Sequence, residues 1–202
     1  MAQRKTTAAN RERIIEVAAK LIRERGIGNT TLADIAVAAQ ISKGTLYYYY
    51  STKGDLIFDV AERHLENMTN RLFRWLESSG TSQPPRNVFR MVLNTVMHSQ
   101  SRGLIHIYLI QEALTENPNL RKRFVQEYRR WRELIEKGLT KIYHGHEDYG
   151  AMAQVLLCTI DGLIMQRLVG ADGLSLDSIA AFFESSIAAN QVAANQVDES
   201  GM

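Results

Sequence analysis

Cysteine, proline and long apolar runs are all scarce in this chain of 202 residues. Its single cysteine, Cys158, excludes an internal disulfide and a zinc site built from cysteines. The apolar letters around it, VLLCTIDGLIM, predict a buried packing residue and not a nucleophile. No apolar run approaches the roughly 18–20 residues that a membrane span needs, and no apolar segment follows the charges at the start. We therefore expect a cytoplasmic protein without a signal peptide.

Strand patterns are rare as well, since polar and apolar residues seldom alternate. The three prolines are Pro84 and Pro85, in a linker, and Pro118, which follows Asn117 at the start of a helical pattern. Helical periodicity covers almost all of the remainder, so the sequence predicts an all-α fold of about nine helices. We place them at 8–25, 31–39, 42–49, 54–78, 86–101, 104–115, 118–143, 149–169 and 176–192.

Charge is distributed unevenly along the chain, although the net charge is only +2. Residues 1–54 hold nine Lys or Arg against four Asp or Glu, a net of +5, and residues 55–202 hold 15 against 18, a net of −3. A basic N-terminal quarter on a mildly acidic body is typical of a surface that meets a polyanion. Chance variation of surface charge is the alternative that composition alone leaves open.

Two short helical patterns lie close together within the basic quarter. The first, 31–39, starts with a predicted capping box, and the second, 42–49, starts with Ser42 as its N-cap. Helices of about eight residues do not persist alone in water, so both must pack on the longer helix 8–25. This arrangement is a helix-turn-helix, whose second helix enters the major groove of DNA. The first turn of this second helix carries small hydrogen-bonding groups and one cation, at Ser42, Lys43, Gly44 and Thr45.

Four consecutive tyrosines occupy the second short helix, and neither a helix nor a strand hides four adjacent rings. Leu46 and Tyr50 share the inward face, four residues apart, so Tyr50 is predicted to be a core ring whose hydroxyl needs a hydrogen-bond partner. Tyr47 and Tyr48 fall on the sides that are free to meet the duplex.

Residues Arg11 to Leu56, with TTLADIAVAAQISKGTLYYYYSTKGDL at their centre, resemble the N-terminal DNA-binding domain of the TetR family of bacterial repressors. The resemblance covers about a quarter of the chain. It implies a DNA-binding domain at 1–54 and an effector-binding and dimerisation domain at 55–202. Core packing or plain solvation is the alternative for each residue that it places at DNA: Thr31, Ser42, Lys43, Gly44, Thr45, Tyr47, Tyr48, Tyr49 and Lys53.

The sequence departs from the family pattern at four positions. Gln40 stands where the family usually has the glycine of the turn, and a left-handed backbone there costs a non-glycine residue about 1–2 kcal/mol. Tyr49 replaces a usual histidine, whose phosphate contact a tyrosine hydroxyl can make, and Tyr50 replaces a usual phenylalanine. Gly54 replaces a common acid and weakens the start of its helix by about 1 kcal/mol.

The last two helical patterns are the most apolar in the chain. The pattern 149–169 is apolar nearly all round, and 176–192 sets Phe182 and Phe183 along a stripe. Such a surplus favours a subunit interface, and a twofold dimer presents two helix-turn-helix units to a palindromic site. A large monomer core is the alternative.

Aromatic, methionine and a few polar side chains in the middle helices are candidates for an apolar effector pocket, as the resemblance implies, although plain core packing explains each of them as well. Asp161 lies inside an apolar run, where a carboxylate needs a partner. The choices are Arg167, a tyrosine, its symmetry mate or a cationic ligand, and we favour a structural pair. The pocket candidates are Met68, Met91, Thr95, His98, Tyr108, Phe124, Tyr128, Trp131 and Asp161.

Catalysis and cofactors find little support, since the sequence holds no glycine-rich phosphate loop, nucleophile elbow or HExxH pattern. His144 and His146, in HGHED, would form at most a weak metal site in a loop. We therefore expect a homodimeric transcriptional repressor, not an enzyme, that a small, largely apolar effector releases from a palindromic DNA operator. The alternatives are an all-α enzyme or ligand-binding protein with a vestigial DNA-binding head, and a protein that coats nucleic acid without sequence preference.

Overall fold

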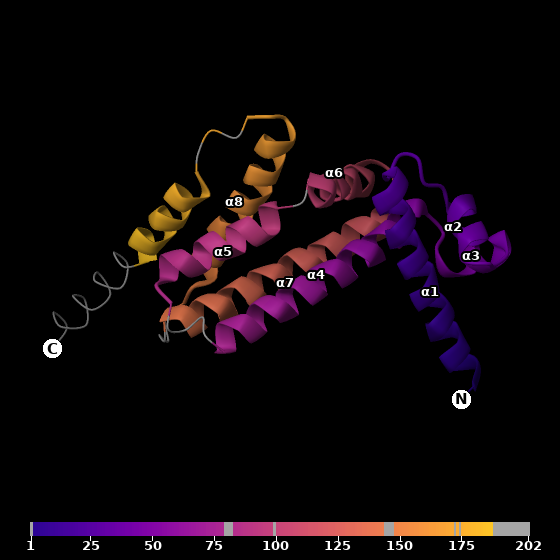
Figure 1. Ribbon diagram of the computed structural model, residues 1–202, viewed down its shortest axis with the longest axis horizontal. Helices are drawn as coiled ribbons and strands as arrows, with labels where there is room; N and C mark the ends of the chain where they lie inside the picture. The colour runs from indigo at the N-terminus through magenta and orange to yellow at the C-terminus, as the bar shows by residue number, and fades with distance from the viewer. Residues whose placement is uncertain are drawn as a thin grey trace. The chain divides into compact units, whose positions relative to one another are not determined.

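The computed structural model describes residues 2–78, 83–98, 100–143, 148–171, 173 and 175–187, without the side chains of 2–8 and 100 (Figure 1). Within these ranges the chain forms nine helices and no strand, which confirms the predicted all-α class. The helices are α1 (Ala2–Arg25), α2 (Leu32–Ala38), α3 (Lys43–Tyr49), α4 (Lys53–Ser78), α5 (Pro85–Met97), α6 (Gln100–Thr115), α7 (Pro118–Tyr143), α8 (Gly150–Leu168) and a last helix at 176–187.

Helix boundaries follow the prediction closely where a cap or a proline marks them. Helix α7 has the predicted bounds, because Asn117 caps it and Pro118 occupies its first position. The predicted helix 86–101 ends four residues earlier, at Met97, and α6 begins at Gln100 instead of 104. No glycine or proline marks this junction in the sequence, so periodicity alone placed it too late. Residues 188–192 of the last predicted helix lie outside the described part of the chain.

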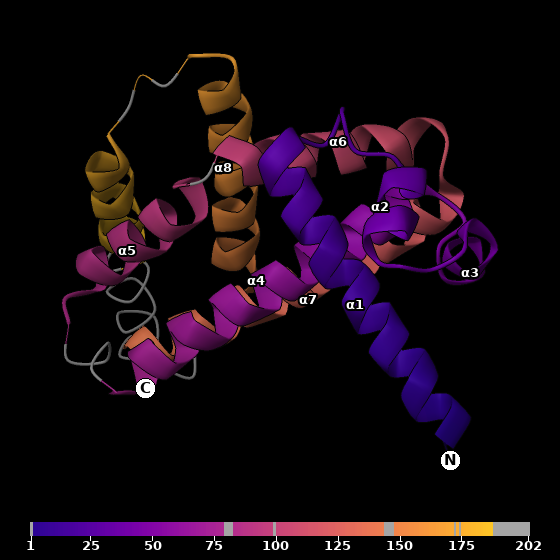
Figure 2. The same cartoon turned by 45° about the vertical axis from the view of Figure 1, so that its right-hand side comes forward.

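The chain packs as two compact units. Unit 1 consists of Met1–Thr69 and Gln100–Tyr128, and unit 2 consists of Asn70–Ser99 and Arg129–Met202. Helices α4 and α7 run side by side and contribute their first part to unit 1 and their second part to unit 2 (Figures 1 and 2). The predicted domain boundary after residue 54 concerns function and not packing, and it stays a prediction.

Unit 1 is built on α1, which packs against α2, while α2 packs against α3 (Figure 2). Ile14 and Ala18 of α1 meet Ile35 of α2 and Leu46 of α3, and all four side chains are at most 1% exposed. Each large aliphatic side chain contributes about 1.5–3 kcal/mol when it is buried. Two helices of seven residues are thus held by tertiary packing, as their length requires.

Unit 2 has its own apolar core, formed by α5, α8, the end of α7 and the helix 176–187. Phe89 of α5 and Phe183 of the last helix are each at most 2% exposed, with ring centroids 5.8 Å apart. Leu139 of α7 and Ala153 of α8 close the same cluster. The apolar stripe predicted for the last helix is therefore buried at Phe183, whereas its neighbour Phe182 is 63% exposed.

Helix α8 is only partly buried within this chain. Its 19 residues include an 18-residue window with a mean hydropathy of 1.2, of which only 22% is buried. By length and composition α8 is therefore long and apolar enough to cross a membrane, and the expectation that no such segment exists is wrong. A single helix of this kind is weak evidence for a membrane span.

Cys158 of α8 is exposed, so the prediction that it is a buried packing residue is wrong. Its sulfur accepts a contact of 3.3 Å from the side-chain amide of Gln154, one turn earlier. Val155, on the same exposed side, is 51% exposed. A helix that is apolar nearly all round does not reveal which of its faces the fold covers, and this explains the error.

Candidate nucleic-acid interface

The start of α2 is fixed by a reciprocal cap between Thr31 and Asp34. The backbone N–H of Asp34 donates to Thr31 Oγ1 across 3.1 Å, and the carboxylate of Asp34 accepts from the N–H and the hydroxyl of Thr31 at 2.9 and 2.6 Å. This confirms the predicted capping box. Hydrogen bonds from the Thr31 hydroxyl and N–H lower the pKa of Asp34. Thr31 remains exposed at the helix start, where a phosphate contact was predicted.

The turn between α2 and α3 contains a non-glycine residue in the left-handed region, Gln40, with φ 54°. The turn closes through a hydrogen bond from the N–H of Ile41 to the carbonyl oxygen of Ala36, at 3.0 Å. The turn therefore keeps the backbone conformation that a glycine would adopt without strain. A non-glycine residue in this region costs about 1–2 kcal/mol, so Gln40 is strained here.

Helix α3 begins at a second side-chain cap and presents small groups to solvent. Ser42 Oγ accepts from the N–H of Thr45 at 3.0 Å and lies 2.8 Å from Thr45 Oγ1. Lys43 and Gly44 are exposed, and a Cβ atom on Gly44 would meet only Ser42 Oγ, at 3.8 Å. No contact within the described residues requires a glycine at this position, and the DNA contact predicted for Gly44 stays a prediction.

The four tyrosines of α3 and its C-cap separate by exposure as predicted. Tyr47 and Tyr48 are 55% and 80% exposed, whereas Tyr50 is 3% exposed beside Leu46 in the core. Tyr49 is half-buried against the core and meets the ring of Tyr48 edge to face, with centroids 5.4 Å apart. Two rings are therefore free to meet a partner, and Tyr49 is free in part.

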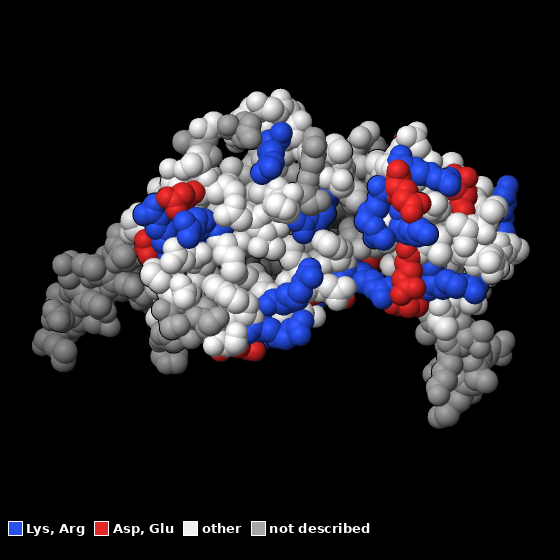
Figure 3. Space-filling view, viewed as in Figure 1, with Lys and Arg blue, Asp and Glu red and all other residues white. Residues whose placement is uncertain are grey.

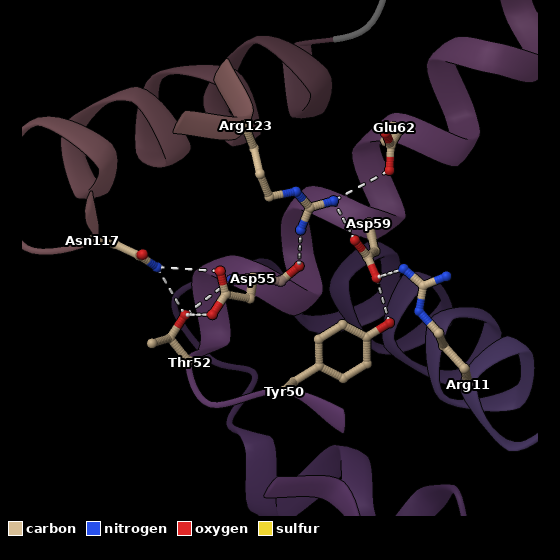
Figure 4. Close-up of polar contacts among 8 residues, drawn as sticks. All are labelled: Arg11, Tyr50, Thr52, Asp55, Asp59, Glu62, Asn117 and Arg123. Carbon is tan, nitrogen blue, oxygen red and sulfur yellow. Dashed lines mark hydrogen bonds and ion pairs between the residues drawn. The ribbon is translucent and has the colours of Figure 1, made fainter. Parts of the chain in front are cut away.

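The hydroxyl of Tyr50 donates to Asp59, a carboxylate that is 3% exposed on α4 (Figure 4). The same carboxylate accepts from Arg11 of α1 at 2.6 Å and from Arg123 of α7 at 2.5 Å. Burial, followed by the hydrogen bond to Asp59, raises the pKa of Tyr50. Sequence reasoning predicted that this hydroxyl needs a partner but did not identify Asp59, because the partner is set by how α4 packs on α3.

Asn117 forms a second polar cluster between the start of α4 and the start of α7 (Figure 4). Its side-chain oxygen accepts from the N–H of Leu120 at 3.0 Å and so caps α7. Its amide nitrogen donates to Thr52 at 3.1 Å, and Thr52 Oγ1 in turn accepts from the N–H of Asp55 at the start of α4. One buried side chain thus ties the start of α4 to the start of α7.

Lys53, a predicted phosphate contact, directs its ammonium group to the carbonyl oxygen of Ile27 in its own chain. Burial lowers the pKa of Lys53, and the charge of Glu112 partly offsets this. The neighbouring Gly54 is buried, and a Cβ atom there would collide with the carboxylate of Glu112. A small residue at position 54 thus makes room for the carboxylate of Glu112, and the phosphate contact of Lys53 stays a prediction.

Acidic side chains pair with some of the basic side chains of α1 and α4. Lys20 lies 3.9 Å from Glu24, and Arg63 of α4 pairs with Glu12 of α1. Figure 3 shows lysine and arginine interleaved with acids on one face of the molecule. Lys43 at the start of α3 is exposed and pairs with no acid in the described part of the chain.

The predicted pocket residues fall into both units. Met68, Tyr108, Phe124 and Tyr128 belong to unit 1, where Phe124 is buried and its ring centroid lies 6.1 Å from that of Tyr128. Burial and a hydrogen bond with Glu112 raise the pKa of Tyr108. The members in unit 2 are Met91, Thr95, His98, Trp131 and Asp161.

The unit 2 members come from α5 and its C-cap, from α7 and from α8. The Thr95 hydroxyl donates to the carbonyl oxygen of Met91 within α5, His98 is exposed and Trp131 is half-buried. Asp161 is half-buried and has an interaction partner, which is compatible with the structural pairing that we favoured. An effector site at these nine residues therefore stays a prediction.

An apolar groove of about 730 Å³ lies in unit 2, along α8 and the last helix. Val155, Cys158, Leu163 and Phe182 are among its lining side chains, and Arg167 is its one charged group. None of the nine predicted pocket residues lines it. The groove coincides with the exposed face of α8 and matches the place where a subunit interface was predicted.

A metal centre has no candidate within the described residues, where no three His, Cys, Asp or Glu side chains gather. His144 and His146 of the HGHED loop lie outside those residues. The sequence-based interpretation of this loop therefore stays a prediction.

Two short helices with an exposed, capped second member, packed on a longer first helix, define a helix-turn-helix DNA-binding domain. Residues 14–60 match the family model described as "Bacterial regulatory proteins, tetR family". The helix-turn-helix of this chain is therefore a TetR-family DNA-binding domain, as its residues predicted.

Known relatives agree with this assignment. An HTH-type transcriptional regulator of Staphylococcus aureus is 44% identical over 62 residues, 31% of this chain and 34% of that protein. YerO of Bacillus subtilis, an uncharacterized HTH-type transcriptional regulator, is 24% identical over 177 residues, 85% of this chain and 61% of its own length. The chain thus spans between one third and three fifths of these two relatives.

The fold is shared with solved structures of the family. Thermus thermophilus FadR, a TetR-family transcriptional repressor in complex with lauroyl-CoA, superposes with a TM-score of 0.64 at 23% identity. The superposition covers 86% of this chain and 90% of that one.

Proposed function

We propose that this protein is a DNA-binding transcriptional regulator that acts as a repressor. The observation that carries the proposal is the way α3 divides its side chains: it buries Leu46, exposes Lys43, Tyr47 and Tyr48, and leaves Thr45 half-buried. Lysine and hydroxyl groups on such a helix can donate to base edges and phosphates, and the threonine methyl suits thymine. Ser42, Gly44 and the hydroxyl of Tyr49 complete this surface, with Thr31 and Lys53 as phosphate contacts at its edges.

A homodimer is part of the proposal, because one helix-turn-helix reads only a half-site. The exposed apolar side chains of α8 and of the helix 176–187 support it, with Val155, Met165 and Phe182 each more than half exposed. A second copy that covers the unit 2 groove would bury these side chains and set two copies of α3 against a palindromic operator. This use of α8 favours a cytoplasmic protein over a membrane span.

A small, largely apolar effector would release the operator. The family relative from Thermus thermophilus holds lauroyl-CoA, whose acyl chain is apolar, and this chain offers aromatic and methionine side chains around Phe124 and Tyr128. A ligand that favours the non-binding conformation by a few kcal/mol suffices to empty the operator. Compounds that raise the melting temperature, beginning with acyl-CoA thioesters of graded length, would identify the effector.

Selection of bound DNA from a random pool, followed by mobility-shift titration, tests the proposal. We expect an enriched palindrome, and weaker binding to it by Thr45→Ala and Tyr47→Ala. An all-α enzyme or ligand-binding protein with a vestigial head predicts no enriched sequence. A protein that coats nucleic acid predicts steep salt dependence without any sequence preference, so the two alternatives give different results.

A further inference from the structure

The buried carboxylate of Asp59 joins four elements of unit 1. It lies on α4 and accepts hydrogen bonds from α1, through Arg11, and from α7, through Arg123. Its third donor is the hydroxyl of Tyr50, the C-cap of α3. Figure 4 shows the three donors converging on this one side chain from different elements. The end of the candidate recognition helix is therefore connected to α7 through a single carboxylate.

Two kinds of contact hold the inward face of α3. Leu46 and the ring of Tyr50 pack in the apolar core, and apolar packing has little directional preference. The hydrogen bond from Tyr50 to Asp59, at 2.6 Å, is buried and directional. Packing therefore keeps α3 on the domain, while the hydrogen bond selects the rotation at which α3 lies there.

Arg123 binds the other oxygen of the carboxylate, Oδ1, through its planar guanidinium group, which also contacts several further partners. Its Nη2 lies 2.5 Å from Asp59 and 3.3 Å from Glu62, and its Nη1 donates to the carbonyl oxygen of Asp55 at 3.4 Å. Its guanidinium carbon stands 4.0 Å from the ring centroid of Phe58. All of these partners belong to α4, so a shift of α7 along α4 would break the geometry that Asp59 depends on.

We propose that Asp59 is a positioning residue that sets the orientation of α3 through Tyr50 and makes this orientation depend on α7 through Arg123. The proposal deepens the proposed function and rests on it, because α3 is taken as the helix that reads DNA. When Arg123 moves away, Asp59 re-forms its hydrogen bonds with the remaining donors. Tyr50 turns with it, and α3 then holds its exposed side chains at a different angle to the duplex.

Amide hydrogen exchange on the full-length protein tests this link without DNA. We expect Arg123→Met to raise exchange of the amides of residues 43–50 about tenfold while those of 14–22 in α1 keep their protection. Tyr50→Phe should have the same effect, and the double variant should add nothing to either single change. Arg129→Met, which removes an exposed arginine of the same helix, is the matched control and should leave α3 unchanged.

Unchanged exchange in α3 for Arg123→Met, or effects of the two substitutions that multiply in the double variant, would overturn the proposal. An equal rise throughout unit 1 would also overturn it, because that result means global destabilisation. None of these outcomes requires an operator, so this inference can fail while the proposed function stands.

DNA binding distinguishes a positioning role from a merely structural role, because a structural role alone would not change affinity for DNA or its salt dependence. On the selected operator, Tyr50→Phe should bind about tenfold more weakly and should reduce the slope of log affinity against log salt, because a misoriented helix makes fewer phosphate contacts. Tyr143→Phe is the control, since its hydroxyl is buried in unit 2 without a hydrogen bond inside the described part of the chain. A lower melting temperature with wild-type affinity and slope would refute a positioning role. If no operator is enriched, the proposed function fails, and the exchange experiment still decides the link.

Discussion

The hydroxyl oxygen of Tyr50 lies 2.6 Å from Oδ2 of Asp59, and both side chains are 3% exposed. A carboxylate this far from water is stable only when hydrogen bonds and opposite charge compensate it. Arg11 and Arg123 supply that charge from two other helices. The cluster is therefore a point at which the stability of unit 1 and the proposed orientation of α3 depend on the same atoms.

Replacing this carboxylate should destabilise the protein strongly. We expect Asp59→Ala to lower the free energy of unfolding by about 3 kcal/mol, because it leaves the buried hydroxyl of Tyr50 and the partly buried guanidinium of Arg123 without this acceptor. Urea denaturation followed by circular dichroism measures the change. Glu62→Ala, which removes a neighbouring and more exposed partner of Arg123, should cost less than about 1 kcal/mol. Equal losses for the two variants would contradict this account.

Relief of backbone strain in the turn should stabilise the protein. Gln40 has φ 54°, and a glycine there removes the clash of Cβ with the backbone. We expect Gln40→Gly to raise the free energy of unfolding by about 1 kcal/mol, part of the strain being offset by the greater entropy of an unfolded glycine. Thermal denaturation measures it, with Gln40→Ala as the control that keeps the strain. A lower melting temperature for the glycine variant would show that the side chain of Gln40 matters more than its backbone.

The cap of α2 should give a stability difference that depends on pH. Thr31→Ala should cost about 1 kcal/mol at neutral pH. The folded pKa of Asp34 is lowered, so the stabilisation linked to this carboxylate is present above its unfolded pKa and is lost as the pH falls through the folded value. The difference in the free energy of unfolding between wild type and Thr31→Ala should therefore become smaller below about pH 4. Urea titrations between pH 7 and pH 3 measure it, and a gap that widens on acidification would contradict the role of the carboxylate.

Lys43 should contribute one ionic contact with DNA. We expect Lys43→Ala to weaken operator binding and to reduce the slope of log affinity against log salt by about 1. Lys20→Ala removes the same charge from α1, where the lysine lies beside Glu24, and should leave the slope unchanged. Mobility-shift titrations at four or more salt concentrations provide both values. Identical slopes for wild type and Lys43→Ala would exclude a phosphate or base contact by this residue.

The exposed apolar face of unit 2 should control oligomeric state. Met165→Glu or Phe182→Glu places a charge where a second copy is proposed to pack, at positions 57% and 63% exposed in this chain. We expect both variants to be folded monomers by light scattering, whereas the wild type is a dimer. Val125→Glu makes a comparable change at a 49% exposed residue of α7 and should remain dimeric. A monomeric wild type would remove the dimer from the proposed function.

Sequence reasoning succeeded for local features, because neighbours in the chain determine them. The cap at Ser42 and the buried Leu46 followed from residue type and helical period alone. Sequence reasoning failed where the helical period does not indicate which face of a helix is buried. Cys158 lies in a helix that is apolar on all sides, so only the packing of α5 and the last helix reveals that its face is left open.

The sequence by itself determined the all-α class, the positions of most helices and the identity of the DNA-binding domain, since these depend on periodicity, capping and a local motif. Only the tertiary structure decided that Asp59 receives the hydroxyl of Tyr50, that Lys53 turns toward Ile27, and that Gly54 makes room for Glu112. Each of these contacts joins helices whose relative placement depends on the summed packing of many side chains. No local pattern in the sequence records that sum.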